Sequence, residues 1–246
     1  MNDLTGKRAL VTGGSRGIGA ATAVALAEAG ADVAITYREA GDEAATVVKQ
    51  IEATGRRGFA FQADLADAAA VEETVARAAD ALGGLDVFVN NAGVGTSGMI
   101  GEVALEEIDR VIAVNVRGAY VAAQAAARRV ADGGRLIHIG SCVGERNAGP
   151  GMSLYALSKS ALVGMNKGLA RDLGARGVTS NVVQPGPTDT EMNPADGPYA
   201  DAQRGFLALG RYGAPEEVAA AVTYLASPAA AFVTGTEVTV DGGHSA

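Results

Sequence analysis

The chain has little of several features that mark whole classes of protein. A single cysteine, Cys142, excludes an intrachain disulfide framework, and no apolar run approaches the ~20 residues that a membrane crossing needs. The first residues, Met1-Asn2-Asp3-Leu4, do not form the charged and then apolar leader of a secreted protein. We therefore expect a cytoplasmic protein without a membrane partner.

Charge and composition narrow the choice further. The net charge of -8 argues against a nucleic-acid partner, which would need a basic face. No Pro/Ser-rich linker or low-complexity tract divides the 246 residues, and strand and helix signals alternate from end to end. We therefore expect one α/β domain over residues 1–246.

A glycine-rich segment follows the first strand signal. The apolar residues 9–12 favour a buried strand, and residues 20–29, rich in Ala, favour a helix. Between them stands Gly13-Gly14-Ser15-Arg16-Gly17-Ile18-Gly19. Glycines in that place let backbone N–H groups and a helix start approach a pyrophosphate. The order predicts a dinucleotide site, although a tightly packed turn also uses glycines.

The end of the next strand bears on which dinucleotide binds. Residues 33–37 favour a strand, and an NAD-binding fold would place an acidic residue near its end for the ribose 2′-hydroxyl. Tyr37 and Arg38 stand there instead, and Arg16 adds a second guanidinium group for a 2′-phosphate. We therefore predict NADP(H) as the preferred cofactor. NAD(H) stays open, with Glu39 in the acidic role.

Two further strand ends add candidates. Residues 59–62 favour a strand that leads into Asp64 and Leu65, where Asp64 would meet an adenine ring or cap the following helix. Residues 86–89 favour a buried strand that ends in Asn90-Asn91-Ala92-Gly93. Small residues there let backbone approach a ligand at the carboxyl ends of the strands, but an ordinary turn also uses Asn and Gly.

Tyr155 and Lys159 are four residues apart, which places both side chains on one face of a helix. An ammonium at ~4 Å would favour the ionised phenol and lower its pKa from the usual ~10 toward neutrality. We therefore predict a lowered pKa for Tyr155 and a role as general acid and base. Taken alone, this spacing more often marks a half-buried Tyr beside a solvated Lys.

Three motifs stand in order: residues 12–19, Asn90-Asn91-Ala92-Gly93 and Tyr155-Ala156-Leu157-Ser158-Lys159. With them the sequence resembles the short-chain dehydrogenase/reductase family over essentially its whole length. It is most similar to the 3-oxoacyl-(acyl carrier protein) reductase-like branch, whose carboxyl-terminal motif residues 234–243 match. The resemblance implies a single-domain, Rossmann-type, doubly wound parallel sheet with helices on both faces. It also implies a nucleotide-binding part over about 1–140, a catalytic and substrate-loop part over about 141–246, and a homotetramer.

Four residues correspond to the family's catalytic set. By resemblance, Ser141 would hydrogen-bond the substrate oxygen, and Tyr155 would exchange a proton with it. Lys159 would lower the pKa of the phenol and hold the nicotinamide ribose. Asn115, expected on a long helix, would support a water that links Lys159 to solvent. From the residues alone, we would instead favour an ordinary strand-end hydroxyl for Ser141 and a satisfied core amide for Asn115.

The turn Pro185-Gly186-Pro187-Thr188-Asp189-Thr190 resembles the family's contact with the nicotinamide carboxamide, with Thr190 as the expected side-chain contact. The polar residues 191–211 resemble its substrate loop, expected to be long and irregular. The cofactor-binding residues that we expect are Gly13, Ser15, Arg16, Gly17, Ile18, Gly19, Tyr37, Arg38, Asp64, Leu65, Asn91, Ala92, Gly93, Tyr155, Lys159, Pro185, Gly186, Thr188 and Thr190. No metal ligands are expected.

The sequence departs from the family beside the catalytic serine. Gly140 stands where a serine is often found, and Cys142 follows Ser141, so the pocket wall there is expected to be unusual. The scattered residues Met99, Met152 and Met192 would line an apolar pocket or fill the core. His138 is expected to be a satisfied core residue, and His244 a residue of the tail.

The leading hypothesis is an NADPH-dependent carbonyl reductase that transfers hydride to a ketone or 3-oxoacyl group, with Tyr155 as acid. An NAD(P)-dependent alcohol, sugar or steroid dehydrogenase in the oxidative direction is the alternative. A non-catalytic nucleotide-sensing protein is a third, although it would not need the acid. Arg128, Arg129 and Arg171 would suit an acidic acyl carrier protein or could simply be surface pairs and helix-end charges.

Overall fold

The computed structural model describes residues 3–147 and 149–246. Seven strands form one parallel sheet in the order β3-β2-β1-β4-β5-β6-β7. The strands are β1 (Arg8–Val11), β2 (Asp32–Tyr37), β3 (Gly58–Gln62), β4 (Leu85–Asn90), β5 (Val130–Ile139), β6 (Thr179–Pro185) and β7 (Glu237–Val240). The expected doubly wound sheet is therefore confirmed.

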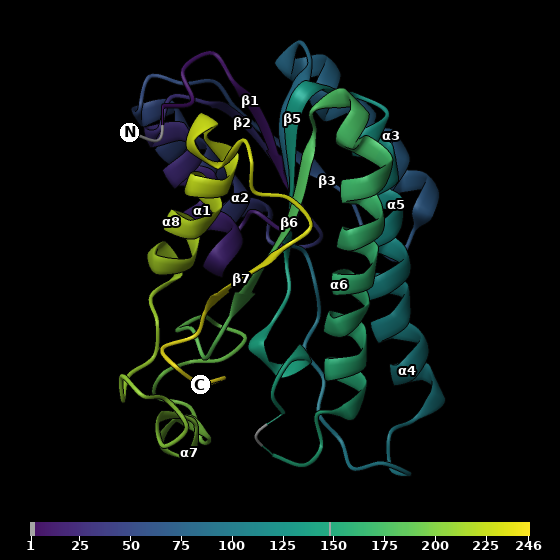
Figure 1. Cartoon of the computed structure of the whole chain (residues 1–246), viewed down its shortest axis with the longest axis vertical. Coiled ribbons are helices and arrows are strands. Elements are labelled where there is room, and N and C mark those ends of the chain that lie inside the picture. The colour runs from purple at the N-terminus through teal and green to yellow at the C-terminus, as the bar shows by residue number, and fades with distance from the viewer. Residues whose placement is uncertain (1–2, 148) are drawn as a thin grey trace.

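Helices cover both faces of the sheet (Figure 1). The helices are α1 (Gly17–Glu28), α2 (Gly41–Ala53), α3 (Ala68–Leu82), α4 (Leu105–Val111), α5 (Ala119–Ala127), α6 (Ser153–Leu173), α7 (Ala200–Arg204) and α8 (Pro215–Ala226). α1, α2 and α8 pack on one face, and α3, α5 and α6 pack on the other. Among the described residues, none of these helices is both long and apolar enough to span a membrane.

The two layers follow from the alternation of side chains along each strand. Ala9 and Val11 of β1 join the core cluster under α1, α2 and α8, whereas Leu10 joins the cluster under α3 and α5. Successive strand residues point to opposite faces, so a strand buried on both faces must be apolar throughout, as β1 is. The apolar runs in the sequence were therefore sufficient to locate the central strands.

The strand order reverses between β1 and β4, and the glycine-rich turn after β1 lies beside the turn after β4. Open α/β sheets bind ligands at the carboxyl ends of the strands on either side of such a reversal. The fold thus brings residues 13–19 and 91–93 to one edge. The division of the chain into a nucleotide-binding part (about 1–140) and a catalytic part (about 141–246) stays a prediction.

Two local features differ in detail from the sequence expectations. Asn115 lies on a long run of helix, as expected, but Ile112–Gly118 between α4 and α5 is π-helical. Such insertions widen one turn and are frequent at functional sites. The segment 191–211, expected to be irregular, contains the short helix α7.

Candidate active site

The glycine-rich turn presents an open helix start. A Cβ at Gly19 would lie 2.2 Å from the carbonyl oxygen of Gly13, so only glycine lets α1 pack this closely against the turn. Gly17 has a φ of 54°, a conformation that favours glycine. Within the described residues, no side chain caps the start of α1, and its first turn carries no acidic residue. The free N–H groups of this turn therefore fit a pyrophosphate.

Asn91 holds the turn in place. Its Nδ2 donates to the carbonyl oxygens of Thr12 at 2.9 Å and Gly13 at 3.0 Å. In return, the hydroxyl oxygen of Thr12 accepts from the N–H groups of Asn91 at 3.0 Å and Ala92 at 3.1 Å. The Asn91 amide is thus engaged with the protein backbone and fixes the shape of the turn, while its contact with a dinucleotide stays a prediction.

The proposed adenosine end is open to solvent. Arg38 pairs with Glu39 at 3.0 Å, and both side chains are half or more exposed, so this ion pair is weak. Arg16 is exposed as well, and it forms no salt bridge with any described residue. Asp64 accepts from the N–H of Ala66 at 2.9 Å, while the cap of α3 is Asp67. Arg16 is therefore open to an anion, whereas Arg38 would exchange its weak, exposed pair with Glu39 for one.

Lys159 is buried one helical turn from Tyr155 on α6. Its Nζ donates to the carbonyl oxygen of Ile139 at 3.0 Å and lies 5.8 Å from the centre of the Tyr155 ring. The side chain is only 6% exposed and, among the described residues, has no carboxylate partner. An ammonium has three N–H donors, so two remain for a ribose diol or water.

The pKa expected for Tyr155 was wrong in direction for the protein alone. Burial raises the pKa of the phenol to about 12, and the neighbouring Ser141 hydroxyl lowers it only in part. Burial also lowers the pKa of Lys159 to about 8. The sequence argument counted only the attraction between the two groups, whereas loss of solvent on burial disfavours the charged form of each.

Ser141 follows the last residues of β5 and is 8% exposed. Its backbone N–H donates to Oε1 of Gln184 at 2.7 Å, and its Oγ accepts from the N–H of Val143 at 3.3 Å. The next residue, Cys142, is buried, and burial raises the pKa of its thiol to about 12. The thiol therefore stays protonated, and the catalytic role of Ser141 stays a prediction.

Asn115 is a satisfied amide in the π-helical segment. Its Nδ2 donates to the carbonyl oxygen of Val94 at 2.9 Å and to Oγ of Ser158 at 3.1 Å, and its Oδ1 accepts from the N–H of Val94 at 2.8 Å. A Cβ at Gly93 would lie 3.2 Å from Oδ1 of Asn115 and 3.4 Å from Nζ of Lys159. The three residues thus meet, although a water-supporting role for Asn115 stays a prediction.

The turn after β6 closes over the glycine-rich turn. A Cβ at Gly17 would lie 3.2 Å from Cγ2 of Thr190, which shows how near the two turns come. The hydroxyl of Thr188 donates to the carbonyl oxygen of Gly186 at 3.0 Å and is therefore turned into its own loop. Oγ1 of Thr190 accepts from the N–H of Asn193 at 3.3 Å, so its hydroxyl proton stays available to a ligand between the turns.

The carboxyl-terminal tail packs against the proposed substrate loop. The N–H of Leu209 donates to the carbonyl oxygen of Gly242 at 3.0 Å, and the buried His244 ring meets Phe206 edge-on at 6.3 Å. Met99 and Met192 are 49% and 61% exposed, so they are not core filler. Met192 lies over Gly95, where its Sδ would be 3.5 Å from a Cβ. These contacts place the segment around 192–209 at the rim of the site.

Comparison with known proteins decides the family. A family model described as Enoyl-(Acyl carrier protein) reductase matches residues 13–245. The chain belongs to the short-chain dehydrogenase/reductase family. It is accordingly an NAD(P)-dependent oxidoreductase that acts on CH–OH or C=O groups.

Relatives of this dehydrogenase/reductase differ in their named functions. The cyclic-di-GMP-binding biofilm dispersal mediator protein of Escherichia coli is 46% identical over 246 residues, and the match covers 100% of both chains. The 3-oxoacyl-(acyl-carrier-protein) reductase of Synechocystis is 39% identical, covering 99% of this chain and 98% of that protein. A short chain dehydrogenase from Burkholderia cenocepacia, solved in complex with NADP, is 55% identical with a TM-score of 0.97, covering 99% of each chain.

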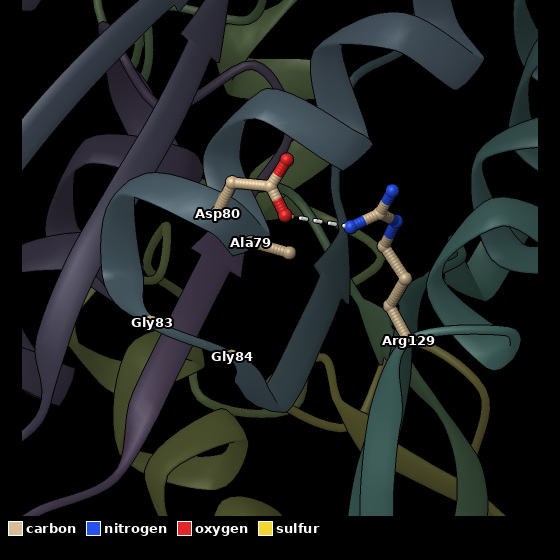
Figure 2. Close-up of a pocket in the computed structure, with 5 residues that line it drawn as sticks. All are labelled: Ala79, Asp80, Gly83, Gly84 and Arg129. Atoms are coloured by element: carbon tan, nitrogen blue, oxygen red, sulfur yellow. Dashed lines mark hydrogen bonds and ion pairs between the residues drawn. The ribbon is translucent and has the colours of Figure 1, made fainter.

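Two groups of this dehydrogenase/reductase lie outside the catalytic edge. Arg129 pairs with Asp80 at 2.8 Å beside a hollow of about 400 Å³ at the amino ends of β4 and β5 (Figure 2), and Arg128 pairs with Glu72 at 3.2 Å. These arginines therefore form the surface pairs that the sequence left open. His138 is fully buried and lies 3.2 Å from Oγ of Ser180, which confirms it as a satisfied core residue.

Sequence reasoning missed Gln184. It is 1% exposed and accepts the N–H of the catalytic-serine candidate, Ser141. The available signal was a polar residue near the end of a buried strand, one position beyond Val183, which pairs with the residue before the unexpected Gly140.

Proposed function

We propose that the protein is an NADPH-dependent carbonyl reductase that reduces a ketone or 3-oxoacyl group with Tyr155 as general acid. The supporting observation is the phenol of Tyr155 set one helical turn from a buried ammonium, with Nζ of Lys159 5.8 Å from the centre of its ring. The phenol carries its proton in the neutral range. An ammonium nearby helps it to donate that proton, because the positive charge stabilises the phenolate that donation leaves.

The proposed roles follow from what each side chain can donate. Bound NADPH would supply the hydride that reduces the carbonyl carbon. Ser141 and Tyr155 would hydrogen-bond the carbonyl oxygen, and Tyr155 would pass its proton to that oxygen as negative charge develops there. Lys159, as an ammonium, would stabilise the phenolate that remains until water returns the proton. The product is the alcohol, and the enzyme recovers its starting protonation.

NADP(H) is the preferred cofactor in this proposal. The Burkholderia cenocepacia relative was solved in complex with NADP. In this chain the open start of α1 fits the pyrophosphate, and Arg16 and Arg38 offer planar donors to the 2′-phosphate. Thr190 and the Lys159 ammonium would bind the nicotinamide end.

Two rivals remain. An oxidative dehydrogenase would use the same groups in reverse, with Tyr155 accepting a proton, and the preference for NADP(H) rather than the site itself favours reduction. A nucleotide sensor is suggested by the name of the Escherichia coli relative, which states that it binds cyclic-di-GMP. The complete set of Ser141, Tyr155, Lys159 and Asn115 favours catalysis, because a sensor would not need the acid. A homotetramer, cytoplasmic residence and an acyl carrier partner are further parts of the proposal.

The test measures initial rates of NADPH and NADH consumption with ketones, 3-oxoacyl thioesters and diketones. NADPH turnover should fall by about 100-fold or more in Tyr155→Phe, which removes the acid and leaves the ring. NADPH affinity, measured without substrate, should change little. NADPH turnover that survives Tyr155→Phe would refute the assigned acid, and cyclic-di-GMP binding without turnover of carbonyls or alcohols would favour the sensor.

A further inference from the structure

Gly140 and Gln184 occupy the same space beside the catalytic serine. Ile139 at the end of β5 pairs with Val183 of β6, so the next residues of the two chain segments, Gly140 and Gln184, lie side by side with their side-chain positions on one face. A Cβ at Gly140 would lie 2.3 Å from Oε1 of Gln184 and 2.8 Å from Cγ1 of Val182. Gln184 therefore fills the volume that a side chain at 140 would need.

Gln184 accepts a hydrogen bond from a backbone N–H group that has no partner in the sheet. The N–H of Gly140 makes the last ladder bond of β5, to the carbonyl oxygen of Val183 at 2.8 Å. The next N–H, that of Ser141, instead donates to Oε1 of Gln184 at 2.7 Å in a fully buried contact. A buried N–H needs an acceptor, so this side chain determines where the backbone of Ser141 leaves the sheet.

The orientation of the Gln184 amide is itself fixed. Its Nε2 donates to Oε2 of Glu237 at 3.0 Å, and Oε1 of Glu237 faces Nζ of Lys167 at 3.6 Å. A carboxylate only accepts and a backbone N–H only donates, so the amide NH₂ must face Glu237 and its oxygen must face Ser141. The network runs from the half-exposed surface of α6 and β7 to the catalytic loop.

We propose that Gln184, held by Glu237, is a positioning residue for Ser141. Gln184 reaches Ser141 from the neighbouring strand, through the volume that the absent side chain of Gly140 leaves free. This inference rests on the proposed function, because it assigns Ser141 to the carbonyl oxygen. Gln184 does not touch the substrate; it sets the direction of the Ser141 hydroxyl, which must be held within about 0.5 Å to act on a developing oxyanion.

The first variant is Gln184→Met, which keeps the length of the side chain and removes both hydrogen bonds. A misplaced donor lowers kcat by about 10- to 100-fold, while the KM for NADPH stays within about twofold. Asn181→Ala is the matched control, because Asn181 is a fully buried amide on β6 that bonds the carbonyl oxygen of Val233 at 2.7 Å, remote from Ser141. It should lower stability without this selective loss of kcat.

A charge exchange keeps the test decisive if Gln184→Met folds poorly. Gln184→Glu alone brings two carboxylates together and should lower kcat, whereas Glu237→Gln alone leaves an acceptor for the amide and should have little effect. Combining the two restores every hydrogen bond, because the new carboxylate accepts from Ser141 and from the new amide. The pair should recover kcat to within about threefold of the wild type.

Hydrogen exchange gives a readout that does not depend on activity. The peptide that contains Ser141 should exchange faster in Gln184→Met than in Asn181→Ala, since only the first variant removes its acceptor. Unchanged kcat and unchanged exchange in Gln184→Met, with activity still lost in Tyr155→Phe, would overturn the role of Gln184 alone. Activity that survives Tyr155→Phe would instead refute the proposed function.

Discussion

Replacing Lys159 with methionine should make the protein more stable and inactive. Lys159 is 6% exposed, and burial lowers its pKa from the ordinary 10.5 to about 8. At neutral pH the charged ammonium of Lys159 is therefore less stable in the folded protein than in the unfolded chain, and this difference lowers the free energy of unfolding. Methionine is of similar length and carries no charge, so it removes this cost.

The magnitude follows from the pKa. Each tenfold change in proton affinity is worth about 1.4 kcal/mol, so a fall from 10.5 to about 8 destabilises the charged form by about 3 kcal/mol. The variant also loses the hydrogen bond from Nζ to the carbonyl oxygen of Ile139, which costs about 1 kcal/mol of stability and offsets part of this gain. The net gain for Lys159→Met is about 2 kcal/mol at pH 7, or a rise in Tm of about 4 to 8 °C for a chain of this size.

The gain must depend on pH in one direction. The unfolded chain binds the proton more tightly, so the cost of Lys159 is complete below pH 8 and is lost as the pH rises from about 8 to 10.5. Urea unfolding without NADP(H), at one protein concentration and at pH 7 and 10, measures this directly. Lys167→Met is the control, because that side chain on α6 is 63% exposed. Equal stability of wild type and Lys159→Met at pH 7, or a gain unchanged at pH 10, would refute the reasoning.

Two further predictions concern the cofactor and the pH profile. Tyr37→Asp with Arg38→Ala should shift the ratio of kcat/KM for NADPH over NADH toward NADH by about 10- to 100-fold. This is the effect of losing one or two charged hydrogen bonds. An unchanged ratio would show that these residues do not contact the 2′-phosphate. The kcat/KM for carbonyl reduction should fall as the pH rises through about 8, because Lys159 then loses the charge that stabilises the phenolate; a profile that stays flat to pH 10 would contradict this role.

Much of the fold and the motif positions could be predicted because they depend on short stretches of sequence. Apolar runs located the buried strands, and the glycine-rich turn lies between β1 and α1 as its order indicated. The helix spacing of Tyr155 and Lys159 was also sufficient to place both on α6. These features need only local periodicity and the position of glycines.

The electrostatics of the site could not be predicted in the same way. The sequence argument used the charge of Lys159 and a distance, but the pKa of each group depends on how much solvent the rest of the fold removes. Burial dominates in the protein alone and raises the pKa of Tyr155. A pKa argument from helix spacing therefore gives the identity of the partner and leaves the direction of the shift undetermined.

Gly140 and Gln184 share one space, and this shows why a single departure from a family pattern is hard to interpret alone. From the sequence, Gly140 was only a missing serine, and Gln184 was only the end of a strand. The register of β5 and β6 makes them neighbours, and Glu237 on β7 then fixes the amide. A glycine at 140 leaves a volume that a residue from the next strand can fill. The glycine in place of serine is therefore explained only when Gln184 is considered with it. The Cβ of a serine at 140 would clash with Oε1 of Gln184, and we infer that these two positions must change together.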